Sequence, residues 1–242
     1  EEVFAYAERI IGLYNEMDNQ VRKLTGDVIG ILVIGASTTI AEYRIPTLLG
    51  EFQQKFPDVR LRLKVSNTVG IVRMVENNEI DVGVVEAPVN NKNMVVKVCW
   101  CDELMLVCPP DHELANSASV KAEQVLAFPF IAREEGSGTR EVISNYFSQH
   151  NLNFDDLKTT MEFGSPESLK SAVSAGLGVT IISESTLDKE LKLGTLQAIS
   201  LNPPMKRPFS IVYQRQKFRL CAMEEFLEFA YAHCDAVEEG AF

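Results

Sequence analysis

From residue 28 onward, short aliphatic runs alternate with segments of helical periodicity, and this alternation limits the possible folds more than any other feature. The expected elements of the first third are strand 28–35, helix 39–56, strand 59–65, a helix capped by Asn67 and Thr68, and strand 80–88. Pro46 is expected to bend the first helix or to lie near its first turn. Because strands separated by helices are joined by right-handed crossovers, this order predicts an α/β fold with a parallel sheet.

The rhythm changes after residue 90, where two strands (94–100 and 103–110) follow each other without a helix between them. A second α/β unit is expected beyond them: helix 121–126, strand 128–132, a helix after Gly138, strand 159–163, helix 166–176 and strand 178–183. Strand 209–214 and helix 218–235 are expected after this unit. The proline-rich segment 201–208 is interpreted as a crossing back to the first unit. With residues 86–90 it would make a two-strand hinge.

Residues 1–25 differ from the rest in having apolar side chains at alternating spacings of four and three. They are Val3, Ala7, Ile10, Tyr14, Met17, Val21 and Leu24. A heptad repeat of this kind favours a left-handed coiled coil, so a dimerisation helix is expected. The alternative is an amphipathic helix that packs on its own domain, because three heptads are few for a coiled coil.

The charge balance argues against direct contact with nucleic acid. The 242 residues carry 34 acidic and 23 basic side chains, a formal net charge of -11, which repels phosphate backbones. The first residues are acidic and lack the features of a secretory signal, and no run of eighteen apolar residues would span a membrane. A cytoplasmic protein without membrane contact is expected. Since Glu1 is not a natural start, we also expect a preceding segment.

The five cysteines are odd in number and contain no CxxC pair, which predicts reduced thiols buried as small hydrophobic side chains. Cys99 and Cys101 are expected on one face of a strand, where a redox switch or a soft-metal site is the less favoured alternative. The histidines are scattered, and Glu134 and Glu135 are adjacent and should point apart. We therefore expect no catalytic residue, metal site or cofactor.

Four strands are followed by turns rich in hydroxyl groups or glycine that each open a helix. The turns contain Ser37, Thr38 and Thr39; Asn67 and Thr68; Gly136, Ser137, Gly138 and Thr139; and Gly164 and Ser165. Helix amino termini at the carboxyl ends of strands carry unpaired N–H groups that suit carboxylate or sulfate. Each turn taken alone could equally be an ordinary helix cap. Four together favour a shared ligand cleft.

The same turns carry a family resemblance. The chain resembles the effector-binding domain of LysR-type transcriptional regulators preceded by their linker helix, through GASTTIAEYRIPTLLGEFQQKFPDVRL, NNEIDVGVVEAP, ELMLVCPPDHELA, REEGSGTREV and SPESLKSAVSAGLGVTIIS. The match runs over nearly the whole chain. GASTT and EGSGTRE look most like the branch linked to sulfur assimilation and cysteine biosynthesis.

The resemblance implies a periplasmic-binding-protein type II-like fold with two Rossmann-like lobes joined by a two-strand hinge. The expected parts are a linker and dimerisation helix (1–25), lobe I (26–88 with 203–235) and lobe II (89–202). It also implies an amino-terminal winged helix-turn-helix that this chain lacks, contact with DNA only through that domain, and a homodimer or homotetramer. The turns listed above become the effector contacts, joined by Glu86 and by Arg133 as counter-charge.

Glu86 departs from what an anion site needs, because a carboxylate repels an anion unless it is protonated, turned away or meeting an ammonium group. This keeps an amino-acid-like effector such as acetylserine open, beside sulfate, sulfite and thiosulfate. The leading hypothesis is thus an effector sensor of a transcription regulator. The alternatives are a stand-alone solute-binding protein of the same fold and, less favoured, an enzyme on a related scaffold.

Overall fold

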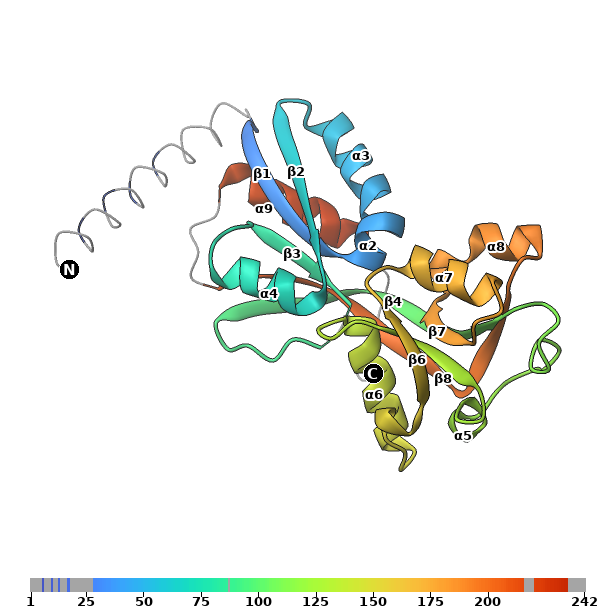
Figure 1. Ribbon diagram of the computed structural model, residues 1–242. Helices are drawn as coiled ribbons and strands as arrows, with labels where there is room; N and C mark the ends of the chain where they lie inside the picture. The colour runs from blue at the N-terminus through green and yellow to red at the C-terminus, as the bar shows by residue number, and fades with distance from the viewer. Residues whose placement is uncertain are drawn as a thin grey trace.

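The computed structural model describes residues 28–86, 88–215 and 220–234, with four single positions before them, Tyr6, Ile10, Leu13 and Met17 (Figure 1). All four are helical, and the side chains of Ile10 and Met17 are 66% and 57% exposed. Ile10 and Met17 belong to the predicted heptad seam. Its other members, Val3, Ala7, Tyr14, Val21 and Leu24, lie outside the described residues. Pairing of this helix with a partner therefore stays a prediction.

Three parallel strands form one end of the main sheet, as the alternation predicted. β1 (Gly30–Ser37) lies between β2 (Val59–Ser66) and β3 (Val82–Val85), and its aliphatic residues are largely buried. The helices of this part are α2 (Thr38–Tyr43), α3 (Ile45–Lys55) and α4 (Thr68–Glu76). The single helix expected over 39–56 is two helices, because the chain turns at Arg44 and Pro46 occupies the first turn of α3, where a missing N–H costs nothing.

Two long antiparallel strands, β4 (Met94–Cys108) and β8 (Gln197–Gln214), extend the sheet, and with β7 (Thr180–Ser183) at its edge the strand order is β2-β1-β3-β8-β4-β7. The prediction of separate strands over 94–100 and 103–110 was wrong, since the ladder continues through the intervening residues. The segment 201–208 is part of β8, which crosses back to the first part of the chain as predicted. Its register shifts opposite Leu104 and Met105, and the extra residues there accommodate prolines that cannot donate to the ladder.

The second part of the chain packs on the far half of these strands. It contains α5 (Ala122–Val125), β5 (Pro129–Arg133), α6 (Gly138–Gln149), β6 (Lys158–Phe163), α7 (Pro166–Ser174), β7 (Thr180–Ser183) and α8 (Asp188–Leu193), with 3-10 turns at Phe154–Asp156 and Glu184–Thr186. β5 and β6 pair in parallel, and β7 pairs antiparallel with β4. α8 was not predicted. Helix α9 (Cys221–Ala232) returns to the first part.

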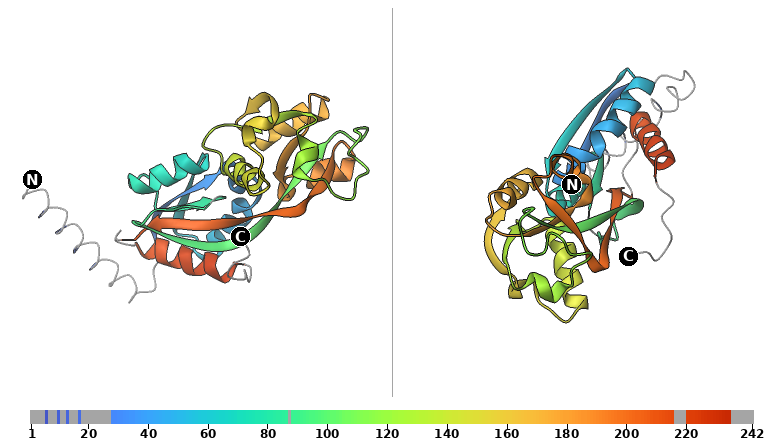
Figure 2. Two further views of the ribbon diagram at one scale, coloured as in Figure 1. Left: turned by 90° about the horizontal axis from the view of Figure 1, so that it is seen from below. Right: turned by 90° about the vertical axis from the view of Figure 1, so that its right-hand side faces the viewer.

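β4 and β8 run side by side along the molecule and contribute to separate hydrophobic cores at their two ends (Figure 2). Trp100 and Phe209 belong to the core beneath β1, whereas Leu104 and Met205 belong to the core around α6. Between them lies what we call the crossing segment, residues 101–103 of β4 and 206–208 of β8. The two cores are therefore joined by β4 and β8, and residue 86 and residues 88–90, which belonged to the predicted hinge, do not lie in a strand.

The cysteines correct a further expectation. Cys99 and Cys234 form a disulfide that joins β4 to the end of α9, so not all five are free thiols. Trp100 Nε1 also donates to the His233 carbonyl oxygen at 2.8 Å. A register shift between Val98 and Trp100 breaks the alternation of β4, so Cys99 is buried while Cys101 is exposed. The two do not share a face as predicted.

Candidate functional site

Each of the four predicted turns precedes a helix; those of Ser37 and Thr139 meet around the buried carboxylate of Glu86, and that of Asn67 contacts the Thr139 turn. Ser37 ends β1, Asn67 precedes α4 and Ser137 precedes α6. Thr139 Oγ1 donates to Glu86 Oε2 at 3.2 Å, which links α6 to the end of β3. The fourth turn contacts Arg133 through a backbone atom, because the Gly164 carbonyl oxygen accepts a hydrogen bond from Arg133 Nη2 at 3.4 Å.

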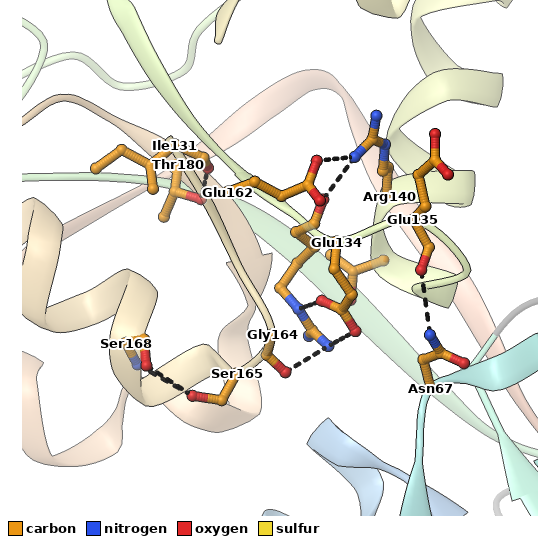
Figure 3. Close-up of polar contacts among 12 residues, drawn as sticks. Asn67, Ile131, Glu134, Glu135, Arg140, Glu162, Gly164, Ser165, Ser168 and Thr180 are labelled. Carbon is orange, nitrogen blue, oxygen red and sulfur yellow. Dashed lines mark hydrogen bonds and ion pairs between the residues drawn. The ribbon is translucent and has the colours of Figure 1, made fainter. Parts of the chain in front are cut away.

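The turn between β5 and α6, residues 134–137, lies directly against the start of α4 (Figure 3). Asn67 Nδ2 donates to the Glu135 carbonyl oxygen at 3.1 Å, and the Val69 N–H donates to that of Gly136 at 3.3 Å. Gly136 has a φ of +79°, and a Cβ there would lie 2.9 Å from Asn67 Nδ2. Only glycine satisfies both the backbone angle and this close approach.

The serine or asparagine residues that precede the helices of the four predicted turns fall into two classes. Asn67 and Ser165 are ordinary caps, since their side-chain oxygens accept from the N–H groups of Gly70 at 2.9 Å and Ser168 at 3.3 Å. Ser37 and Ser137 make no cap hydrogen bond although both are buried. The capping explanation thus holds for two turns and fails for the two that lie nearest Glu86 and Thr139.

Several buried polar atoms at this place lack a hydrogen-bond partner among the described residues. They are Ser37 Oγ, Thr68 Oγ1, Ser137 Oγ, Arg133 Nη1 and Arg207 Nη2. An unsatisfied buried donor costs about 1–3 kcal/mol, and more when it is charged. Three hydroxyls and two guanidinium groups can all donate, so a small molecule that offers several acceptor oxygens would satisfy them.

Glu86 is ionised and paired with Arg207, a residue that the sequence analysis did not single out. Arg207 Nη1 bonds Glu86 Oε2 and also lies 2.9 Å from Thr139 Oγ1, while Nε donates to Asp102 Oδ2 at 2.7 Å. Ser183 Oγ donates to the other Asp102 oxygen at 2.7 Å. The place of Arg207 two residues from Met205 and two from Phe209, both buried, was the signal of an inward-facing arginine.

The charges around Glu86 explain how a carboxylate can lie in a site for an anion. Burial alone would raise the pKa of Glu86, but the charges of Arg207 and Arg133 outweigh it and hold that pKa below its ordinary value. The Ser37 and Thr39 hydroxyls also favour the ionised form, although Ser37 Oγ makes no hydrogen bond of ordinary geometry. Glu86 needs no ammonium group from a ligand, because Arg207 already supplies the counter-charge.

Arg133 is a buried cation at the end of β5, only 2% exposed, and not a surface residue. Its Nε and Nη2 donate to the two carboxylate oxygens of Glu134 at 2.7 and 3.0 Å. Of the remaining predicted residues, Thr39, Thr68 and Gly138 are buried, while Thr38 and Ser165 are half-buried.

A second polar contact joins α2 to α7. The Tyr43 hydroxyl donates to Glu167 Oε1, and Lys170 Nζ lies 3.1 Å from the same hydroxyl. Burial and the Glu167 carboxylate raise the pKa of Tyr43 to about 12, so the hydroxyl keeps its proton at neutral pH. No turn motif in the sequence pointed to Tyr43 or Lys170.

Metal binding has no support in this part of the protein. Among the described residues, no group of three or more histidine, cysteine, aspartate or glutamate side chains could hold a metal ion. Within the same residues, no helix is long and apolar enough to cross a membrane.

Comparison with known proteins agrees with the resemblance seen in the sequence. Residues 25–235 match the family described as the LysR substrate binding domain. A probable RuBisCO transcriptional regulator of Cyanidium caldarium is 34% identical over 225 residues, covering 91% of this chain and 71% of the relative. The RuBisCO operon transcriptional regulator of Allochromatium vinosum is 31% identical over 239 residues, covering 96% and 78%.

Solved structures show the same fold. The Synechocystis PCC6803 CcmR regulatory domain, in complex with 2-PG, has a TM-score of 0.78 and 30% identity, covering 86% of this chain and 98% of that one. The cofactor-binding domain of the Cbl transcriptional regulator has a TM-score of 0.76 at 23% identity, covering 86% and 91%. The periplasmic-binding-protein type II-like fold is thereby confirmed. The chain belongs to the LysR-type transcriptional regulators and contains their effector-binding domain.

Proposed function

We propose that this domain binds a small anionic metabolite among Ser37, Thr68, Ser137, Arg133 and Arg207 and thereby alters the DNA binding of the regulator. The observation that carries the proposal is the set of unsatisfied buried donors on these residues. A closed arrangement that leaves them unsatisfied is costly, so a ligand that satisfies them stabilises closure. The relatives are named as transcriptional regulators, which favours this role over a solute-binding protein or an enzyme.

The identity of the effector is argued from the relatives. The sulfur-assimilation branch receives no support from them, because the curated relatives are named for RuBisCO. Cbl shares only the fold at 23% identity. The CcmR regulatory domain, at 30% identity, was solved with 2-PG. We therefore take 2-PG as the first candidate effector and keep sulfate, sulfite, thiosulfate and acetylserine as the comparison ligands.

Closure of two lobes on the effector would couple effector binding to DNA binding. Our proposed division starts from 26–88 with 203–235 for one lobe and 89–202 for the other, but moves both boundaries to the crossing segment, because Trp100 packs in the core beneath β1 and Met205 in the core around α6. Closure would be held by the Asn67–Glu135 and Tyr43–Glu167 contacts. Coupling between effector and DNA requires different effector affinities for the open and closed forms, typically about 1–3 kcal/mol.

Self-association completes the proposed regulator. The helix at residues 1–25 would pair with a second copy, supported by the exposed apolar side chains of Ile10 and Met17. DNA would be bound by an amino-terminal domain that precedes this chain. A homodimer, or a tetramer built from two such pairs, would convert lobe closure into a changed spacing of the DNA-binding domains.

Thermal unfolding with and without each ligand tests the proposal. We expect 2-PG to raise the midpoint in a saturable way, because a ligand that binds only the folded state stabilises it by mass action. Ser37→Ala should reduce the shift, since Ser37 Oγ is one of the unsatisfied donors. Ser165→Ala is the control, because its hydroxyl already serves as a cap. No shift with any anion would overturn the proposed site.

A further inference from the structure

The guanidinium of Arg133 is the one charge in the proposed site whose partner can leave. Arg207 is fully buried and lies between Glu86 and Asp102, which are also buried. Glu134, in contrast, has a 24% exposed side chain at the start of the turn 134–137. The Glu134 carboxylate can turn into water because its side chain already lies partly at the surface, whereas moving Glu86 or Asp102 would require the core to open.

The Glu134 carboxylate binds the Arg133 guanidinium in the way that an anionic ligand would. Two parallel N–H···O bonds of 2.7 and 3.0 Å join the Nε and Nη2 edge to the carboxylate, the geometry preferred by arginine for carboxylate and phosphate groups. Nη1 has no partner among the described residues. A ligand with one anionic group therefore finds the better edge of the guanidinium already taken.

We infer that Glu134 is an internal counter-ion that binds Arg133 while the site is empty and yields it to an anionic effector. This inference rests on the proposed function and adds the residue that sets the affinity and charge selectivity of the site. A neutral or zwitterionic ligand cannot replace the Glu134 carboxylate without leaving Arg133 undercompensated. An anionic ligand can, so the exchange selects for negative charge.

The exchange also has a route to the rest of the domain. Glu134 begins the turn whose next two carbonyl oxygens, from Glu135 and Gly136, accept from Asn67 and Val69 of the α4 start. When Glu134 swings toward solvent, the same short turn must adjust, and the contacts that hold α4 change with it. Effector charge is thereby converted into a change in the contact between α4 and the β5–α6 turn.

Glu134→Gln compared with Glu135→Gln tests the inference. Both variants lose one negative charge from adjacent positions, but Glu135 is exposed and its side chain makes no ion pair shown among the described residues. We expect sulfate and 2-PG, at constant ionic strength, to bind Glu134→Gln about five-fold or more tightly than Glu135→Gln. The ligand-free Glu134→Gln variant should unfold at a lower temperature. The substitution is thus expected to lower the stability of the ligand-free protein while it raises the affinity for the ligand.

Equal or weaker sulfate binding by Glu134→Gln relative to Glu135→Gln would overturn the inference, whatever 2-PG does to the unsubstituted protein. The response of the unsubstituted protein to 2-PG decides the proposed function separately. If Glu134→Gln does not fold, Glu134→Asp against Glu135→Asp provides the same comparison. The shorter carboxylate keeps the charge and loses the bidentate contact, so tighter sulfate binding is again expected and its absence would count against the inference.

Discussion

Replacing Arg207 with methionine should show how strongly the paired charges at the crossing segment stabilise the fold. Methionine keeps a long unbranched side chain but leaves Glu86 and Asp102 buried without the cation that bonds both. Removal of one partner of a buried ion pair typically costs about 3–5 kcal/mol. Since whole domains are stable by only about 5–15 kcal/mol, a loss of this size moves the urea midpoint substantially.

The effect should depend on pH in a defined direction. In the native protein the pKa of Glu86 is lowered below its ordinary value of 4.5, so its contribution is present above that value and is lost as pH falls through the lowered pKa. Without Arg207, burial dominates and raises that pKa. The carboxyl then favours the folded state when protonated, and this contribution is lost as pH rises through the raised pKa. The stability gap between the two proteins should therefore widen from pH 4 to pH 8.

Urea unfolding at several pH values measures this gap. Lys206→Met is the matched control, because Lys206 is the adjacent, exposed cation on β8 and its loss should change stability little at any pH. Restoring charge balance with Glu86→Gln and Asp102→Asn in the Arg207→Met background should recover much of the loss and remove the pH dependence. A gap under about 1 kcal/mol, or one that is constant with pH, would refute the argument.

Three further outcomes are expected. Gly136→Ala should lower stability by about 1 kcal/mol and weaken 2-PG binding, whereas Gly176→Ala, with a similar positive φ and nothing within 4 Å of its Cβ, should lower stability alone; equal binding by both would contradict a role for the turn against α4. Ser137→Ala should leave the ligand-free midpoint unchanged and reduce the 2-PG shift, while Ser165→Ala should cost about 1 kcal/mol of stability and leave the shift intact; a destabilised ligand-free Ser137→Ala would show that the hydroxyl has a partner. Denatured, unreduced protein should expose three titratable thiols and reduced protein five, by mass after alkylation; five in both would contradict the disulfide.

Much of the architecture followed from periodicity, because most elements bury a face whose spacing is visible in the chain. The parallel arrangement of β1, β2 and β3 and the helix after each turn were predicted correctly. The continuity of β4 was not, because Asp102 looks like a break when its partner is unknown. Arg207 lies 105 residues away from Asp102, and only the fold shows that the two polar side chains face each other in the core.

The candidate site was partly predictable for the same reason. Hydroxyl-rich turns are local signals, so Ser37, Asn67 and Ser137 could be placed near a common edge from their strands. Local pattern could not separate a cap from an unsatisfied donor, which depends on whether a neighbouring N–H lies within reach. The pairing of Cys99 with Cys234 joins positions 135 residues apart and likewise leaves no trace in spacing.

The two register shifts in the β4–β8 ladder, near Trp100 and near Leu104, lie on either side of Asp102 and Arg207. A pair of hydrogen-bonded strands bends out of its plane more easily than the strands slide past each other, because sliding breaks all the hydrogen bonds between them at once. Relative movement of the two ends is then a flexing about this short stretch, where displacement is smallest. The Asp102–Arg207 pair at this stretch would stay nearly still, while the surrounding residues move farther and define how large a ligand fits. Size preference would then depend on the moving residues and charge preference on Arg133 and Glu134, so the two can be altered by substitutions in different places.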